Sequence, residues 1–335
     1  MKFSRGRRRS ASIGEDMSDI RYSIVITCFN QREFIRDAVE SALSQEASIR
    51  EVIVVDDASK DGSAEILKRY EDSIRLLGLC SNRGAIEARN RGAALARGEY
   101  LIFLDGDDLF LPWTLDVYEQ LVELRRPAVI VSTVRHFEGP VPALGAFEKP
   151  DRLEFVEYDA LMAKDRPHGW YTNAMVISRR AFEEVGGWTP GIFQLDDLDM
   201  VSKLGYCGKC ILIFSPCTAL YRKHAGNTSH FVPPFLRSAR LIIDRERAGL
   251  YPGGPEKRLE RYAFHGGMVF FWTVKGLNAG LYRSALKLAA RGWPMIMVAV
   301  LRKSIVVIHG RRRVEVGRLD RDGSLVLTFA GNIEN

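Results

Sequence analysis

An apolar run that ends in three aspartates constrains the fold of this chain most strongly. Residues 100–104, YLIFL, are short, aromatic and β-branched enough for a buried strand, and the run stops at Asp105-Gly106-Asp107-Asp108. Carboxylates this close repel one another, so a neighbouring cation would stabilise their charged forms. Their oxygens are hard ligands that suit magnesium or manganese. The alternative is a solvated acidic turn that caps the next helix, and the tetrad alone does not decide.

Buried strands and amphipathic helices alternate over the first third of the chain. Apolar runs predict strands at 22–29, 51–55, 74–79 and 100–104, and apolar spacing predicts helices at 32–45, 62–71 and 84–97. This alternation indicates parallel βαβ units and an α/β fold. Ligands of such sheets bind beyond the carboxyl ends of the strands. We therefore expect Thr27, Asp57 and Asp105, which end or follow three of these strands, along one edge of the sheet.

Two common nucleotide-binding signatures do not occur in the sequence. The first strand is not followed by G-x-G-x-x-G, and G-x-x-x-x-G-K-[ST] is not present, so a dinucleotide fingerprint and a P-loop are excluded. A nucleotide can still bind through carboxylates and a metal. The net charge of +6 favours anionic partners, of which nucleotides, phospholipids and nucleic acid are the general classes.

The five cysteines indicate a reducing compartment. Their number is odd and they are scattered through 335 residues, which is typical of free thiols in a cytoplasmic protein. A zinc site could be drawn from Cys207, Cys210, Cys217 and His224. We expect no such site, because Cys210 leads into the apolar run 211–214 and buried thiols behave as small hydrophobes.

The chain divides into three regions by composition. Residues 1–20 are polar and basic, without the apolar core of a signal peptide, and are predicted to be disordered. Residues 21–231 hold the strand–helix alternation and form the predicted α/β domain. Residues 232–335 are predicted to be helical and to end in a β-hairpin between 312 and 329. The helices are expected at 235–249, 256–277 and 280–304.

The C-terminal region carries a signal for membrane association. The dense apolar segment 293–301 is followed by Arg302-Lys303 and by three arginines at 311–313. Apolar side chains flanked by basic residues suit the surface of an anionic membrane, and the alternative is helices packed on the domain 21–231. No eighteen uncharged apolar residues occur in a row, so no spanning helix is expected. We predict peripheral association through residues 280–313.

Six segments, in order, resemble the family 2 glycosyltransferases, which have the GT-A fold. They are SIVITCFNQ (23–31), VVDDASKDGS (54–63), NRGAIEARNRGAALARGEYLIFLDGDD (82–108), GGW (186–188), LDD (195–197) and YRKHAGNTS (221–229). The resemblance implies a nucleotide-binding, mostly parallel sheet flanked by helices, here with a helical C-terminal extension. It also implies inverting transfer of a sugar from a nucleotide-sugar donor, usually UDP-linked. The implied acceptor is a hydroxyl of a glycan or lipid-linked molecule, in cell-surface polysaccharide synthesis on the cytoplasmic side of the plasma membrane.

The resemblance implies a nucleotide site made by four residues. Thr27 matches the residue that lines the nucleotide pocket, and Asp57 matches the acid that accepts a hydrogen bond from the ring N–H of uracil. Asp105 matches the first acid of the D-x-D pair, near the ribose. Arg89, on the preceding helix, is placed to approach the diphosphate, and its alternative is a solvated helix face.

The resemblance also implies a metal site. Asp107 matches the second acid of the D-x-D pair, which binds Mg²⁺ or Mn²⁺ that bridges the diphosphate and offsets charge on the leaving group. His224 matches a histidine that closes over the metal or the diphosphate. A lone histidine can equally be structural.

The acceptor side is implied by the segment 186–199. Asp197 matches the general base, Asp196 precedes it, and Trp188 is expected to stack on a sugar. A helix N-terminus also favours acids, and both roles can hold together. Trp170, at the start of the strand-like run 170–177, is expected to line the sugar pocket.

Two other classes of protein remain as alternatives. A sugar-phosphate nucleotidyltransferase also uses an α/β fold and a metal, but its glycine-rich basic signature near the first strand is not present. A noncatalytic sugar-binding or scaffold protein would not need the acids Asp57, Asp105, Asp107 and Asp197. The resemblance gives no reason to expect a nucleic-acid partner.

Overall fold

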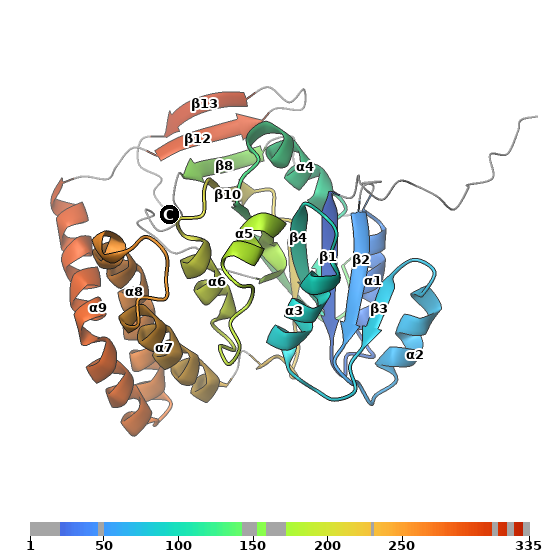
Figure 1. The fold of residues 1–335 in the computed structure, drawn as a ribbon, viewed down its shortest axis with the longest axis horizontal. Helices are drawn as coiled ribbons and strands as arrows, with labels where there is room; N and C mark the ends of the chain where they lie inside the picture. The colour runs from blue at the N-terminus through green and yellow to red at the C-terminus, as the bar shows by residue number, and fades with distance from the viewer. Residues whose placement is uncertain are drawn as a thin grey trace, which may run out of the picture.

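The computed structural model describes residues 21–45, 50–142, 153–158, 172–228, 231–309, 314–319 and 325–330. Within these ranges ten strands form one sheet in the order β13-β12-β8-β10-β6-β9-β4-β1-β2-β3, with helices on both faces (Figure 1). The predicted α/β class is therefore correct, with one half of the sheet parallel and the remainder mixed. The predicted disorder of residues 1–20 and the side chain of Trp170 lie outside the described residues.

The parallel half of the sheet is built from the first four strands. They are β1 (Tyr22–Cys28), β2 (Arg50–Asp56), β3 (Arg75–Gly78) and β4 (Tyr100–Asp105), and the connecting helices are α1 (Ile35–Leu43), α2 (Ser63–Leu67, continued by a 3-10 turn over Lys68–Tyr70) and α3 (Ala85–Leu95). All neighbouring pairs in the order β4-β1-β2-β3 are parallel. Each of these elements was predicted from apolar spacing, with bounds that differ by a few residues.

The apolar residues of β1 alternate between the two faces of the sheet, as strand geometry requires. Ile24 and Ile26 join a core with α1 and with α4 (Thr114–Arg125). Val25 faces a second core, which contains buried residues of α3, of α5 (Arg179–Glu184) and of α6 (Asp196–Leu204). In the chain, α4 follows the strand β5 (Leu109–Phe110). Both α5 and α6 come after the strand β9 (Met175–Ser178).

The second half of the sheet mixes parallel and antiparallel pairs. Strand β9 runs antiparallel between β4 and β6 (Val129–Val131), and β10 (Cys210–Ser215) pairs parallel with β6. A 3-10 turn at Thr172–Ala174 precedes β9, so only the end of the predicted run 170–177 is strand. Strand β8 (Leu153–Tyr158) is antiparallel to β10.

A small sheet lies near the carboxyl edge of the parallel strands. It consists of β5, β11 (Ala219–Lys223) and β7 (Val134–Glu138), with β11 in the middle. Strand β11 is antiparallel to β5 and parallel to β7. Because β5 follows the aspartate tetrad directly, this pairing brings the segment 221–224 beside those aspartates.

Three helices follow β11 and form a layer beside α6 (Figure 1). They are α7 (Val232–Arg247), α8 (Arg258–Asn278) and α9 (Tyr282–His309), and a 3-10 turn at Pro255–Lys257 leads into α8. Helices α8 and α9 approach closely where Gly266 faces α9, since a Cβ there would overlap the carbonyl of Met295. Residues Tyr282–Arg302 are long and apolar enough to cross a membrane by length and composition, which differs from the sequence expectation.

The two last strands return to the central sheet. Strands β12 (Val314–Leu319) and β13 (Leu325–Ala330) pair antiparallel, in agreement with the predicted hairpin, and β12 also pairs with β8. The hairpin of the region 232–335 thus extends the sheet that contains β1 to β4. The domain boundary at residue 231 stays a prediction.

Candidate active site

The carboxyl ends of β1, β2 and β4 meet because the strands are parallel and in register. Thr27 is opposite Asp105, and its hydroxyl donates to Asp105 Oδ1 at 3.3 Å. The N–H of Gly106 donates to the Thr27 carbonyl at 2.9 Å. A Cβ at Gly106 would collide with that carbonyl oxygen and with Gln31 Oε1, so glycine is needed here for close approach of two strands. The structure thus brings Thr27 and Asp105 together, as predicted.

Asp57 follows β2 and shapes the start of α3. Its two carboxylate oxygens accept from the backbone N–H groups of Arg83 and Gly84, both at 2.7 Å, and the residue is buried. Each carboxylate oxygen carries two lone pairs, so each can still accept one further donor. Asp57 lies at the predicted edge of the sheet, and its hydrogen bond to a base stays a prediction.

Arg89 connects two segments of the predicted site. Its guanidinium donates to Asp105 Oδ1 at 2.7 Å and to Asp196 Oδ2 at 2.5 Å, and the residue is 5% exposed. The alternative of a solvated helix face is therefore wrong. Two carboxylates hold the pKa of Arg89 above its usual range against the opposing effect of burial. A planar guanidinium with several donors suits this bridging position.

Trp188 does not present a face to a ligand in this structure. The residue is 1% exposed, and its indole packs edge-on against Phe103 with ring centroids 5.2 Å apart. The Arg89 guanidinium lies 5.3 Å from the indole centroid. Asn90 fixes the backbone of Trp188 with two hydrogen bonds of 2.9 Å. The prediction that Trp188 stacks on a sugar is corrected: its indole fills the core and supports Arg89.

Asp107 and His224 contact each other at the solvent-accessible side of the candidate site. His224 Nε2 is 2.9 Å from Asp107 Oδ2, and both side chains are partly exposed. Burial and the charge of Asp105 raise the pKa of Asp107, while the contact with His224 opposes this shift. The imidazole also packs against the ring of Phe34 at 4.6 Å between centroids. The pairing joins two residues that are 117 positions apart in the chain.

The third aspartate of the tetrad is structural. Asp108 is 2% exposed and accepts from the backbone N–H of Arg222 and from Asn173 Nδ2, both at 2.8 Å. Burial and the charges of Asp107 and Asp105 raise its pKa. It connects β11 and the turn before β9 to the end of β4, and is turned away from solvent.

Arg222 belongs to the site although sequence reasoning did not single it out. Its side chain donates to the Asp107 carbonyl at 3.0 Å and to Asp37 Oδ2 at 2.8 Å. The guanidinium also lies 4.8 Å from the ring centroids of Phe34 and Phe137. The available signal was its position two residues before His224 in the segment that resembles the family.

Asp196 and Asp197 begin helix α6. Asp196 is engaged with Arg89, whereas Asp197 Oδ1 accepts from the N–H of Leu198 at 2.6 Å. Burial, followed by the charge of Asp196, raises the pKa of Asp197 well above its usual range, although Leu198 and Arg89 oppose the shift. A raised pKa is a common property of carboxylates that exchange protons during catalysis.

Asp107 and His224 could contribute two ligands to a metal. Among the described residues no group of three or more His, Cys, Asp or Glu side chains is placed to hold a metal ion. Magnesium-type sites often use only one or two carboxylates and complete their coordination with water and substrate phosphates. The like charges that raise the pKa of Asp107 would favour a cation, so the residues present fit a metal shared with a diphosphate.

The four candidate zinc ligands do not converge. Cys210 is buried on β10, the backbone carbonyl of Cys217 accepts from Trp113, and His224 contacts Asp107. Cys207 is directed to the carbonyl of Lys203. All five cysteines are unpaired with one another in the structure.

Comparisons with known proteins give a family and several relatives. Residues 23–186 match the family described as Glycosyl transferase family 2. A putative teichuronic acid biosynthesis glycosyltransferase, TuaG, of Bacillus subtilis is 39% identical over 104 residues, which are 30% of this chain and 40% of TuaG. The UDP-Glc:alpha-D-GlcNAc-diphosphoundecaprenol beta-1,3-glucosyltransferase WfaP of Escherichia coli is 32% identical over 136 residues, 40% of this chain and 53% of WfaP. The chain thus matches about half the length of these relatives, or less.

Two solved structures share the fold at low sequence identity. Residues 1–349 of S. aureus TarS, in complex with UDP-GlcNAc, have a TM-score of 0.55 at 15% identity, covering 92% of this chain and 97% of that one. The mannosyltransferase PcManGT of Pyrobaculum calidifontis, in complex with GDP-Man and Mn²⁺, has a TM-score of 0.52 at 16% identity. It covers 86% of this chain and 80% of its own. These likenesses extend the shared GT-A fold beyond residue 186.

Proposed function

This chain belongs to the glycosyl transferase family 2 through residues 23–186, and we propose that it transfers a sugar from a UDP-linked donor to a hydroxyl group with inversion. One observation carries the proposal. Arg89 bridges Asp105, at the predicted nucleotide side, and Asp196, beside the predicted base Asp197. This bridge fixes the position of the nucleotide side relative to the acceptor side, as a direct displacement requires.

The nucleotide side of the proposed site comprises Thr27, Asp57, Arg89 and Asp105. Asp57 would accept from the ring N–H of the base, and Asp105 would lie near the ribose. Arg89 adds a cation close to this edge, although its two ion pairs make a positioning role more important than direct contact with phosphate. The name of WfaP includes the donor UDP-Glc, and the TarS structure contains UDP-GlcNAc. Both support UDP as the nucleotide.

Asp107 would bind a divalent metal, Mg²⁺ or Mn²⁺, with His224 beside it. Such a metal would neutralise negative charge on the departing diphosphate. The Mn²⁺ in the PcManGT complex supports this choice. Asp107 contributes the hard oxygen ligand, and His224 keeps the carboxylate in place through the 2.9 Å contact.

Asp197 would act as the general base. A sugar hydroxyl is a weak nucleophile until its proton is removed in the transition state. Asp197 takes that proton, the acceptor oxygen bonds to the anomeric carbon, and the bond from that carbon to the diphosphate oxygen breaks. Attack from the face opposite the leaving group inverts the anomeric configuration. Its raised pKa gives the Asp197 carboxylate a higher proton affinity than that of an ordinary aspartate.

The acceptor would be a glycan or a lipid-linked molecule in cell-surface polysaccharide synthesis. The names of TuaG and WfaP, which refer to teichuronic acid and to a diphosphoundecaprenol acceptor, support this. Trp170, which lies outside the described residues, is still proposed to line the sugar pocket, and Asp196 is proposed to border it. The enzyme would work in the cytoplasm, at the inner face of the plasma membrane.

Helices α8 and α9 would contact that membrane. Exposed apolar residues recur at helical spacing along α9, namely Tyr282, Leu286, Trp293, Met297 and Leu301, and α8 adds Phe270, Phe271 and Val274. Helix α9 contains no acidic residue, and Arg283 and Lys287 lie next to this stripe. A long apolar stripe with a basic border suits an anionic lipid surface. The alternative, that α9 packs wholly on the catalytic domain, does not account for these exposed side chains.

Calorimetry and a donor assay would test the proposed function. Titration of UDP in the presence and absence of Mn²⁺ should give metal-dependent binding, which a scaffold protein would not show. A panel of nucleotide sugars should then yield slow, metal-dependent release of the nucleoside diphosphate from one donor. Release of pyrophosphate from a nucleoside triphosphate and a sugar phosphate would instead identify a nucleotidyltransferase.

A further inference from the structure

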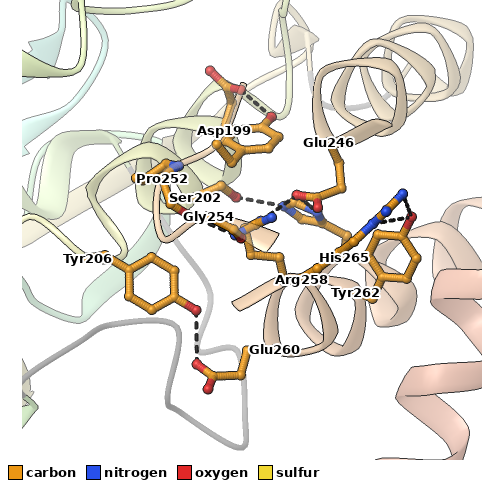
Figure 2. A network of polar contacts seen from close by, with 12 residues as sticks. Asp199, Ser202, Tyr206, Glu246, Pro252, Gly254, Arg258, Glu260, Tyr262 and His265 are labelled. Atoms are coloured by element: carbon orange, nitrogen blue, oxygen red, sulfur yellow. Dashed lines mark hydrogen bonds and ion pairs between the residues drawn. The ribbon is translucent and has the colours of Figure 1, made fainter. Parts of the chain in front are cut away.

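We infer that Tyr251 and Asp199 are positioning residues that fix helix α6, and with it Asp197, to the C-terminal helices; the inference rests on the proposed role of Asp197. Figure 2 shows the network of polar contacts that carries it. The tyrosine hydroxyl donates to Asp199 Oδ1 at 2.5 Å, and both residues are buried. Arg245, on α7, adds a cation 3.4 Å from the same oxygen.

A second contact joins α6 to α8. Ser202 Oγ and His265 Nε2 are 2.9 Å apart, and both groups are fully enclosed. Asp199 and Ser202 are three residues apart, so they lie on the same face of the helix. Two polar side chains of the C-terminal region, Tyr251 in the loop after α7 and His265 on α8, therefore hold this face of α6.

The position of Tyr251 is itself fixed by a buried ion pair. Arg261 donates to Glu246 Oε2 at 2.8 Å, which ties α8 to α7. The same guanidinium donates to the carbonyls of Pro252 at 2.8 Å and Gly254 at 3.0 Å. The loop that follows Tyr251 is thus held by α8, and the tyrosine is held against α6.

This arrangement favours a role in geometry over a role in stability. Desolvation of a buried ion pair usually offsets most of its attraction, so an apolar core of equal volume would be at least as stable. Hydrogen bonds, unlike apolar contacts, fix direction. The network therefore adds directional contacts that fix the rotation of α6 about its axis.

That rotation determines where Asp197 lies. At about 100° per residue, Asp197 is roughly 200° from Asp199, on the other side of the helix. A helical side chain ends about 5 Å from the axis, so a rotation of about 15° moves it by roughly 1.3 Å. A misplacement of about 1 Å can reduce an enzyme's rate by roughly a hundredfold.

A matched pair of tyrosine variants tests the inference. Tyr251→Phe removes the hydroxyl that holds Asp199 and keeps the ring. Tyr206→Phe removes a similar hydrogen bond, 2.9 Å to Glu260, just beyond the end of α6. Hydrogen exchange of peptide 196–204 and Mn²⁺-dependent hydrolysis of the UDP-sugar selected by the donor panel would be measured for both, with UDP binding by calorimetry.

Tyr251→Phe should lower kcat about tenfold with unchanged KM and UDP affinity, and should speed exchange at the first turn of α6. Tyr206→Phe should do neither. In an Asp197→Asn background Tyr251→Phe should have no further effect on kcat, because both changes act through one group. Equal losses in the two tyrosine variants, or additive losses in the double variant, would overturn the inference. Near-normal turnover of Asp197→Asn alone would instead reject the proposed base.

Discussion

His224 Nε2 lies 2.9 Å from Asp107 Oδ2, although Asp107 follows β4 of the large sheet and His224 follows β11 of the small one. The pairing of β5 with β11 creates this contact, since β5 follows the aspartates and β11 ends one residue before the histidine. Asp107 thus has a neighbour that can hold its carboxylate toward a cation. Two predictions for the metal site follow from this relationship.

Asp107→Ala should abolish Mn²⁺-dependent binding of UDP while the fold survives, because it removes the hard oxygen ligand. Titration calorimetry with UDP and Mn²⁺ measures this, and circular dichroism checks the fold.

His224→Gln should weaken the same binding by roughly 10–100-fold, the usual effect of losing a group that orients a metal ligand. Unchanged affinity in the alanine variant would contradict the assignment.

Arg89→Lys should destabilise the protein by roughly 1–3 kcal/mol, because a lysine cannot replace both charge-assisted hydrogen bonds to Asp105 and Asp196. Arg91→Lys, on the same helix, is the matched control: its pair with Glu87 is exposed and should contribute less than about 1 kcal/mol. Urea unfolding of both variants gives the comparison. Similar changes in the two would mean that Arg89 is not a structural bridge.

His265 should make the protein less stable in mild acid. Burial, and then the nearby Arg261 cation, lowers its pKa to about 3, and Arg261 also neutralises Glu246, whose Oε2 is 3.9 Å from the imidazole. The unfolded histidine binds a proton below about pH 6.5 while the folded one stays neutral, so this contribution to stability falls as pH drops from 6.5 toward 3. At pH 5 the loss is about 2 kcal/mol. Between pH 7 and 5 the free energy of unfolding of His265→Gln should fall by about 2 kcal/mol less than that of the unmodified protein.

Flotation with liposomes should show whether α9 contacts anionic lipid. The protein should be recovered with vesicles that contain phosphatidylglycerol, and more weakly at high salt, because the basic border is screened. Leu286→Glu on the exposed stripe should reduce recovery about tenfold or more, as expected when one leucine is no longer buried. Leu124→Glu, an exposed leucine on α4, should have no effect. Equal recovery with neutral vesicles would argue against the basic border.

The parts of the fold that depend on local pattern could be predicted from the sequence. Strands β1, β2 and β4 are continuous apolar runs, and each ends in the polar residues that meet at the sheet edge. This is why Thr27 and Asp105 were placed together correctly. The hairpin of β12 and β13 also followed from its alternation, but its pairing with β8 is a contact between distant segments and has no local signal.

The partners of individual site residues could not be predicted for the same reason. Arg89 and Asp196 are 107 residues apart, so the burial of the arginine depends on how α3 and α6 pack. Trp188 was expected at a sugar because tryptophan suits either a core or a carbohydrate surface, and only the position of Phe103 and Phe182 beside it decides for the core. The contacts between α6 and the C-terminal helices likewise arise only from tertiary packing.

Asp197→Asn tests the central claim most directly, since it keeps the size of the side chain and removes its basicity. The variant should retain UDP and Mn²⁺ binding and lose transfer by roughly 10²–10⁴-fold, the contribution of a general base. The anomeric configuration of the product of the unmodified enzyme, measured by NMR, should be opposite to that of the donor. Near-normal turnover of the variant, or a product that keeps the donor's configuration, would contradict single displacement with Asp197 as the base.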